Sequence, residues 1–207
     1  MIAIVDYRAG NLTSVRLAFE HLGAPAKVTR DPGEIAATER VVFPGVGAAG
    51  SAMHNLNELG LSEMLRGIVS AGTPFLGICL GTQVIFEHSE EDGGVECLGI
   101  VPGTVKKFSP SDPLCKIPQM GWNTIEIQHR HPLFDGIEDE SEFYFVHSYY
   151  PVPSDASYVL AETGYAGARF ASVIGKDNLV ATQFHPERSG RIGLKLLENF
   201  SQWDGSC

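Results

Sequence analysis

A cysteine with one glycine two positions before it and another two positions after it constrains the fold of this chain most. The stretch is Gly77-Ile78-Cys79-Leu80-Gly81. Residues 75–78 are mostly apolar and predict a buried parallel strand, and the apolar residues of 80–87 recur at helical spacing. We therefore expect the cysteine on a sharp turn between a strand and a helix, at the carboxyl edge of a sheet.

Such a turn suits Cys79 for nucleophilic chemistry. The flanking glycines permit so sharp a turn because they have no side chains. At the start of a helix, free backbone N–H groups and the helix dipole favour the thiolate, which is the form that attacks a carbonyl carbon. The alternative is a structural cysteine, because most free cysteines are buried in cores.

The first half of the chain alternates short apolar runs with segments of helical periodicity. This alternation predicts a parallel sheet with right-handed crossover helices. A glycine, Gly60, is expected to break or bend the longest helical segment. The expected strands are 2–5, 27–29, 41–43 and 75–78, and the expected helices are 12–22, 32–38, 51–71 and 80–87.

The second half is rich in β-prone segments. Two of them flank Gly175-Lys176-Asp177-Asn178, which is a good hairpin signal, and helix 189–200 closes the chain. The fold class is therefore α/β, with a mostly parallel sheet flanked by helices and continued by an antiparallel section. The expected strands are 99–108, 123–127, 142–147, 158–161, 170–174 and 179–184.

Composition excludes several classes of function. A formal net charge of −10, with only 15 Lys and Arg scattered over 207 residues, argues against nucleic-acid binding. No apolar stretch approaches the roughly 20 residues that span a bilayer, and the N-terminal sequence does not resemble an export signal. Because no linker-like segment divides the chain, we expect one domain over residues 1–207, in the reducing cytoplasm.

Cysteine and histidine spacing does not predict a metal site. His129 and His131 are close in sequence, but no Asp, Glu or Cys at ligand spacing joins them. The cysteines also lack the C-x-x-C spacing of many metal sites. We therefore expect neither a metal nor a cofactor. The cysteines are Cys79, Cys97, Cys115 and Cys207.

A second candidate site segment is His185-Pro186-Glu187, which follows the expected strand 179–184. In an extended chain, residues two positions apart point to the same side, so Glu187 is expected to hold one imidazole nitrogen of His185. The other nitrogen would serve Cys79, giving a nucleophile, a base and an orienting carboxylate. The alternative is an exposed loop histidine, with Glu187 as an acidic residue in the first turn of a helix.

Glycines also end the neighbouring expected strand, at Pro44-Gly45-Val46-Gly47. Thiolate attack on an amide requires N–H donors for the oxyanion, and we expect them from Leu80 and from the amides around Val46 and Gly47. The glycines would also let the Val46-Gly47 peptide turn either its carbonyl or its N–H inward. The alternative is an ordinary glycine-rich turn, and no phosphate-loop pattern follows.

Together, the segments 44–47, 77–83 and 185–187 resemble the three signatures of the triad-type (class I) glutamine amidotransferases. The resemblance extends along essentially the whole chain. It implies hydrolysis of glutamine through a glutamyl thioester, with Cys79 as nucleophile, His185 as base and Glu187 as orienting residue. It also implies that glutamine is held by Gly47, Gln83, His147, Ser148 and Tyr149. Gln83 would contact the α-amino or the α-carboxylate group.

Further segments resemble, within this family, the glutaminase subunits of imidazole glycerol phosphate synthase. They are Asp6-Tyr7 with Gly10-Asn11-Leu12, Pro118 with Met120 to Asn123, and Tyr144 to Tyr149. This resemblance implies ammonia delivery to a separate (β/α)8-barrel cyclase in histidine biosynthesis. We expect Asn11 and Trp122 at that interface, with Trp122 in a Pro/Gly-bearing loop, because exposed aromatic residues often anchor partners. The alternative for Trp122 is a core aromatic.

Two positions depart from the family pattern. Arg8 stands where glycine is common, and Thr82 stands where methionine is frequent. Neither belongs to the expected triad. Two other functions remain open on these residues: the glutaminase of another pathway, such as vitamin B6 synthesis, and a non-catalytic or redox-sensing α/β module.

Overall fold

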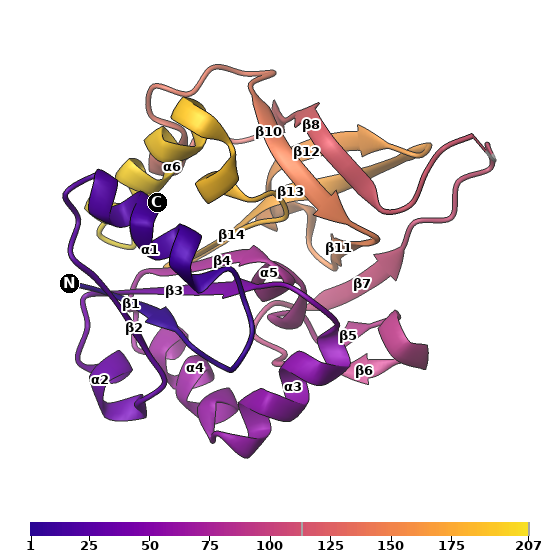
Figure 1. Cartoon of the computed structure of the whole chain (residues 1–207). Coiled ribbons are helices and arrows are strands. Elements are labelled where there is room, and N and C mark those ends of the chain that lie inside the picture. Colours follow the sequence, from indigo (N-terminus) through magenta and orange to yellow (C-terminus); the bar gives the residue numbers. More distant parts are fainter. Residues whose placement is uncertain (113, 207) are drawn as a thin grey trace.

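The computed structural model describes residues 1–112 and 114–206, and an eight-stranded sheet forms its centre (Figure 1). The strand order is β2-β1-β3-β4-β14-β13-β12-β9. Helices α1 and α6 cover one face of this sheet, and α2 to α5 cover the other (Figure 1). This arrangement confirms the predicted fold class. Among the described residues, no helix has the length and apolar character that crossing a bilayer requires.

The parallel half of the sheet follows the predicted alternation closely. Its strands are β1 (Ile2–Val5), β2 (Ala26–Thr29), β3 (Arg40–Gly45) and β4 (Phe75–Cys79). Its helices are α1 (Leu12–His21), α2 (Pro32–Ala36), α3 (Ala49–Glu58) and α4 (Leu61–Ser70). Gly60 adopts φ 67° between α3 and α4, which confirms the predicted break.

Side chains of these strands alternate between two hydrophobic cores. Ile2 and Ile4 of β1 pack with Phe19 of α1, whereas Ala3 and Val5 pack on the opposite face against α2 to α4. Because residues two apart share a face, each strand contributes to both layers. The strands are thus buried on both sides, as their continuous apolar runs predict.

Helix α5 (Leu80–Val84) is shorter than the predicted segment 80–87. The chain segment around Ile100 takes the place of its next turn. The Leu98 N–H donates to the Val84 carbonyl over 2.9 Å, and the Ile100 N–H donates to the Ile85 carbonyl over 2.8 Å. Since these carbonyls bond to a distant segment, the helix ends early.

The antiparallel half of the sheet joins the parallel half through β14, which runs parallel to β4 with Leu179 opposite Phe75. The predicted hairpin is confirmed, although its turn is only Asp177-Asn178, and β14 ends two residues before the predicted limit of Phe184. The strands are β9 (Glu126–Ile127), β12 (Val159–Tyr165), β13 (Ala168–Lys176) and β14 (Leu179–Thr182).

Two smaller sheets lie on the side toward which the parallel strands point (Figure 1). One pairs β8 (Gln119–Thr124) with β10 (Glu142–His147), and the other contains β11, β7, β5 and β6. The remaining elements are β5 (His88–Ser89), β6 (Val95–Glu96), β7 (Gly103–Lys107), β11 (Tyr149–Pro153), α6 (Gly190–Gln202), and the 3-10 turns η1 (Glu91–Gly93), η2 (Pro132–Phe134), η3 (Ala156–Tyr158) and η4 (Pro186–Arg188).

Candidate active site

Cys79 ends β4, and α5 begins at the next residue. Its backbone has φ 54° and ψ −105°, a conformation that costs a non-glycine residue about 1–3 kcal/mol. Close packing explains the glycines around it. A Cβ atom at Gly81 would lie 1.9 Å from the Phe43 carbonyl oxygen, and one at Gly77 would lie 3.1 Å from Ala181 Cβ. The elbow is therefore held in a strained shape by the approach of α5 to the sheet.

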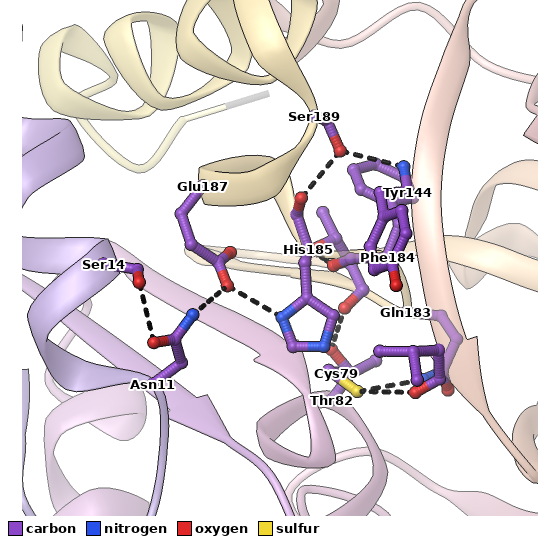
Figure 2. A network of polar contacts seen from close by, with 12 residues as sticks. Asn11, Ser14, Cys79, Thr82, Tyr144, Gln183, Phe184, His185, Glu187 and Ser189 are labelled. Carbon is purple, nitrogen blue, oxygen red and sulfur yellow. Dashed lines mark hydrogen bonds and ion pairs between the residues drawn. The ribbon is translucent and has the colours of Figure 1, made fainter. Parts of the chain in front are cut away.

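His185 and Glu187 are brought together by a turn. The expectation of an extended chain through Glu187 is wrong, because residues 186–188 form η4. This turn returns the carboxylate to the ring, and His185 Nδ1 lies 2.8 Å from Glu187 Oε1. The two side chains are 2% and 0% exposed. Figure 2 shows the pair beside the sulfur atom of Cys79.

Backbone bonds fix His185 in this place. Its N–H donates to the Tyr144 carbonyl over 2.9 Å, which ties the segment to β10. The Ser189 hydroxyl donates to the His185 carbonyl over 2.6 Å and accepts from the Tyr144 N–H over 2.9 Å (Figure 2). The imidazole is therefore held between α6 and β10, facing the end of β4.

The charges around His185 favour its protonated form. Burial lowers the pKa of His185, but the neighbouring Cys79 sulfur and the Glu187 carboxylate outweigh burial and raise the pKa to about 10. Its Nε2 makes no regular hydrogen bond to any described group. This buried nitrogen is thus free to exchange a proton with a group at the cysteine.

A cavity of about 430 Å³ lies over Cys79. It brings together every residue that the sequence predicted for the oxyanion site and for glutamine binding, while Glu187 lies behind His185. The lining residues are Val46, Gly47, Cys79, Leu80, Gln83, Glu91, Pro118, Val146, His147, Ser148, Tyr149, His185 and Arg188.

The segment expected to supply oxyanion donors lies directly beside the cysteine, because Gly45 pairs with Cys79 in the β3–β4 register. The backbone of Gly45 packs closely against the Tyr7 side chain, because a Cβ atom at Gly45 would lie 2.5 Å from the Tyr7 hydroxyl oxygen. Gly47 adopts φ 100°, which favours glycine, and has open space around it. Val46, between them, is 43% exposed.

Two residues near Cys79 carry polar groups that the sequence interpretation missed: Glu91, which lines the cavity, and Gln183, which is buried behind the sulfur. Glu91 lies on η1 and accepts a hydrogen bond from the Ala49 N–H at 2.7 Å; burial raises the pKa of its carboxyl group. Gln183 is 0% exposed, and its Nε2 lies 3.7 Å from Cys79 Sγ. The only sequence signal for Gln183 was a polar residue in an apolar run, and for Glu91 a position within an acidic cluster.

Trp122 does not lie in a loop, so that expectation is wrong. It lies on β8 opposite Tyr144 of β10, with the ring centroids 6.2 Å apart. Its side chain is 54% exposed, and Met120, two positions earlier on the same strand, is 66% exposed. Arg188 lies over the other ring, 4.6 Å from the Tyr144 centroid. Trp122 is therefore neither a core aromatic nor a loop residue.

Asn11, which the sequence placed at a partner interface, lies behind Glu187. Its Nδ2 donates to Glu187 Oε1 over 3.4 Å, and its Oδ1 accepts from the Ser14 hydroxyl over 2.7 Å (Figure 2). A second cavity of about 500 Å³ opens here and shares His185, Val46 and other residues with the first. Asn11 thus contacts the Glu187 carboxylate, and its role in docking stays a prediction.

His131, which was considered with His129 as a metal ligand, packs inside the protein. Its Nδ1 accepts a hydrogen bond from the Leu133 N–H at 3.1 Å, and its ring contacts Trp203. Within residues 1–112 and 114–206, no group of three or more His, Cys, Asp or Glu is arranged to hold a metal ion. Thr82, the departure on α5, is also buried, and its hydroxyl donates to the Thr182 carbonyl over 2.6 Å.

Comparison with known proteins agrees with this geometry. The family model described as glutamine amidotransferase class-I matches residues 3–202. Subunit HisH of imidazole glycerol phosphate synthase from Desulfovibrio desulfuricans is 50% identical, covering 98% of this chain and 94% of that protein. The same subunit from Herpetosiphon aurantiacus is 48% identical, covering 97% and 93%.

Solved structures show the same fold at low sequence identity. A crystal structure of a glutamine amidotransferase aligns with a TM-score of 0.72 at 18% identity, covering 97% of both chains. A putative GMP synthase subunit from Thermoplasma acidophilum aligns with a TM-score of 0.72 at 20% identity, covering 97% of this chain and 92% of that one. These two likenesses establish the architecture alone.

Proposed function

The chain belongs to the class-I glutamine amidotransferase family, and on that basis we propose that it is the glutaminase subunit of an imidazole glycerol phosphate synthase. It hydrolyses glutamine to glutamate and ammonia for histidine biosynthesis. The observation that carries the proposal is the buried His185–Glu187 contact beside Cys79 in the wall of a cavity. Relatives 48–50% identical over nearly the whole chain favour this pathway over vitamin B6 synthesis or a redox-sensing module.

The chemistry begins with Cys79 as thiolate and His185 as imidazolium. The sulfur attacks the side-chain amide carbon of glutamine, forming a C–S bond while the carbonyl electrons move to oxygen. When this intermediate collapses, the C–N bond breaks and His185 gives its proton to the departing nitrogen, which leaves as ammonia. The raised pKa of His185 supports this role, because the ring is protonated at neutral pH.

Water completes the cycle. Neutral His185 takes a proton from a water molecule, whose oxygen attacks the thioester carbon, and collapse releases glutamate and the Cys79 thiolate. Glu187 holds the Nδ1 side of the ring throughout. The oxyanion of both intermediates would be stabilised by the Leu80 N–H and by N–H groups around Val46 and Gly47, which lie beside the sulfur.

Glutamine would be held along the wall of the cavity. The Glu91 carboxylate is the negative group best suited to the α-ammonium group, because it is half-buried and already fixed by the Ala49 N–H. Gln83 and the 147–149 segment line the same cavity. Together they would distinguish an amino acid amide from a simple amide.

The ammonia would pass to a separate (β/α)8-barrel cyclase in a heterodimer in the cytoplasm, with residues 1–207 as one glutaminase domain. Trp122 and Met120 give an exposed apolar surface on β8, close to the Arg188 and Tyr144 side chains at the edge of the cavity. Such a surface beside a reaction site suits a partner that receives the product. Asn11 lines the second cavity, which shares His185 and Arg188 with the first.

The test is ammonia and glutamate release from glutamine, measured for this chain with and without a purified cyclase subunit. We expect release by the complex and none by the Cys79→Ala variant. That variant should still bind the cyclase, because it removes the reacting sulfur and little packing. Glutamine hydrolysis by the Cys79→Ala complex would overturn the assignment.

A further inference from the structure

We propose that Gln183 is a positioning residue that directs a side-chain N–H at the Cys79 sulfur and fixes the orientation of the Gln83 amide. The inference rests on the proposed glutaminase function and adds a residue to it. Gln183 lies two positions before His185, so one short segment after β14 would carry both the base and this donor.

Gln183 is held rigidly in the core. Its side chain is 0% exposed, and its backbone N–H donates to the Ser172 carbonyl over 2.9 Å. Its side-chain Nε2 lies 3.7 Å from Cys79 Sγ, and its Oε1 accepts from Gln83 Nε2 over 3.0 Å. Figure 2 shows Gln183 next to the sulfur, apart from the His185 ring. The sulfur is thus approached by the His185 ring and by this amide, and the Val146 carbonyl oxygen lies 3.9 Å from it.

A backbone carbonyl fixes the direction of this chain of amides. The Tyr149 carbonyl can only accept, so the group that meets it at 2.9 Å must be the Nε2 of Gln83. The second hydrogen of that nitrogen then faces Gln183, which must present its Oε1. Gln183 Nε2 is left for Cys79. Rotating either amide by half a turn would place two donors or two acceptors together.

An amide donor would help the sulfur in a way that His185 does not. Its N–H stabilises the thiolate through a charge-assisted hydrogen bond and does not titrate, so it remains when His185 gives up its proton. It also fixes the sulfur from a second direction. The thiolate released at the end of each cycle would therefore still have a donor.

The same network assigns a role to Gln83. Both hydrogens of its Nε2 are used, by Tyr149 and by Gln183, so the free group of this amide is its oxygen. No described group donates to that oxygen, and Gln83 lines the cavity. It would accept from the α-ammonium group of glutamine, and it is unsuited to the α-carboxylate.

Other titratable groups near the sulfur are His185 with Glu187 behind it, Tyr7 from the segment after β1, His147 from β10, and Glu91 on the cavity wall. Burial raises the pKa of Tyr7 and lowers that of His147 to about 4, so both stay neutral between pH 5 and pH 9. A change in Cys79 ionisation in that range would reflect its partners His185 and Gln183.

The test is the pH dependence of Cys79 alkylation by iodoacetamide, followed by mass spectrometry of the Cys79 peptide so that the other cysteines do not contribute. In Gln183→Met we expect the apparent thiol pKa to rise by about one to two units, as loss of a hydrogen bond to a charged group predicts. Gln183→Glu should raise it further, because it adds a negative charge. Thr82→Val, which removes a buried hydrogen bond on α5 in which the sulfur takes no part, should leave it unchanged.

Steady-state kinetics of the complex give the second readout. In Gln183→Met, KM for glutamine should rise and kcat should fall, with kcat/KM lower by about ten- to hundredfold at neutral pH. A thiol pKa that is unchanged in both Gln183 variants would overturn the inference. If Gln183→Met folds poorly, an unchanged thiol pKa in Gln183→Glu alone would overturn it. Alkylation needs no turnover, so a wild-type complex that fails to hydrolyse glutamine would overturn the proposed function alone.

Discussion

The side chain of Glu187 has no exposed surface. Its carboxylate accepts hydrogen bonds from His185 and Asn11. An uncompensated buried charge is unfavourable, so this residue is retained in the interior by the positive charge of the imidazolium ring. In the proposed mechanism its contribution to catalysis is therefore indirect. It holds the ring in place and favours the protonated form.

We predict that Glu187→Gln reduces kcat less than His185→Ala does. An amide keeps the shape of the carboxylate and part of the contact with Nδ1, whereas alanine removes the group that moves protons. We expect a loss of about 10²–10⁴-fold for His185→Ala and a smaller one for Glu187→Gln. Glutamine turnover of the complex measures both. Equal losses would contradict the separate roles.

His131 makes stability depend on pH. Burial lowers its pKa to about 4, below the usual value near 6.5 of an unfolded chain. The unfolded state therefore binds more protons between these values, so the stabilisation is complete above about pH 6.5 and is lost as the pH falls toward 4. The shift corresponds to up to about 3 kcal/mol over this range.

The prediction for His131→Asn is a flatter pH profile of unfolding free energy. Asn keeps an oxygen that can accept from the Leu133 N–H but has no proton to gain. Urea denaturation at pH 7.5 and at pH 5 measures the difference. His147, whose pKa burial also lowers to about 4, contributes a loss of the same sign, so some acid sensitivity should remain. An unchanged profile would show that His131 is not responsible.

At the scale of elements, the position of α5 depends on one missing side chain. A Cβ atom at Gly81 would lie 1.9 Å from the Phe43 carbonyl oxygen, which is part of β3 and cannot rotate away. The helix would have to move off the sheet. Because Cys79 is the residue that joins β4 to this helix, such a movement would also displace the sulfur.

We predict that Gly81→Ala destabilises the fold by about 1–3 kcal/mol or more and strongly reduces glutamine turnover. Gly67→Ala is the matched control, because Gly67 lies inside α4 with nothing within 4 Å of an added Cβ. That change should stabilise the protein by about 0.5–1 kcal/mol. Urea denaturation of the two variants checks the pair, and equal stability would contradict the packing argument.

Local patterns in the sequence predicted most elements of the fold, because the apolar runs of β1, β3 and β4 and the periodicity of α1 and α6 depend on nearby residues. They also predicted the elbow at Cys79. They failed where distant segments decide the structure. Helix α5 ends early because its carbonyls accept hydrogen bonds from the Leu98 and Ile100 amides. Trp122 lies in a strand because β10 pairs with β8.

The candidate site shows the same division. The residue types of Cys79 and His185-Pro186-Glu187 indicate nucleophile and acid–base chemistry from the sequence, and the structure places these residues together. The path between them was predicted wrongly, since η4 and not an extended strand presents Glu187. Glu91 and Gln183 had no distinctive motif, because their importance comes from contacts with α3 and α5, far away in the sequence.

At the scale of the whole molecule, Trp122→Ala should weaken binding to the cyclase without unfolding this chain. Trp122 is 54% exposed and contacts Tyr144 only at the edge of its ring, so little core packing depends on it. Isothermal titration with the cyclase and thermal melting of the free variant measure the two effects. Unchanged affinity, or a large fall in melting temperature, would remove Trp122 from the interface.

We also predict that the free chain is a poor glutaminase and that the cyclase with its bound ligand stimulates it. Gly47, at φ 100°, can exchange backbone conformations at little steric cost because it is a glycine, so the Val46-Gly47 peptide could point its carbonyl or its N–H at the oxyanion. Loss of one such donor costs about 3 kcal/mol, or roughly a hundredfold in rate. A partner that binds the N–H-inward form more tightly shifts the population.

Turnover of the free chain, the complex and the ligand-saturated complex tests this switch. Gly47→Val should abolish the stimulation, because a β-branched residue is strained at φ 100°. Equal turnover in all three states would rule the switch out.

The parallel pairing of β4 with β14 has a consequence for the order of events during synthesis. Gln183 lies 104 positions after Cys79, and the Leu179 to Phe75 register is what brings the His185 segment to the sulfur. A nascent chain on the ribosome that has passed Cys79 must therefore grow by 104 residues to reach Gln183, and further to reach the proposed base and orienting carboxylate. A chain that stops before Gln183 keeps the cysteine but lacks these proposed partners, so we expect it to leave glutamine intact.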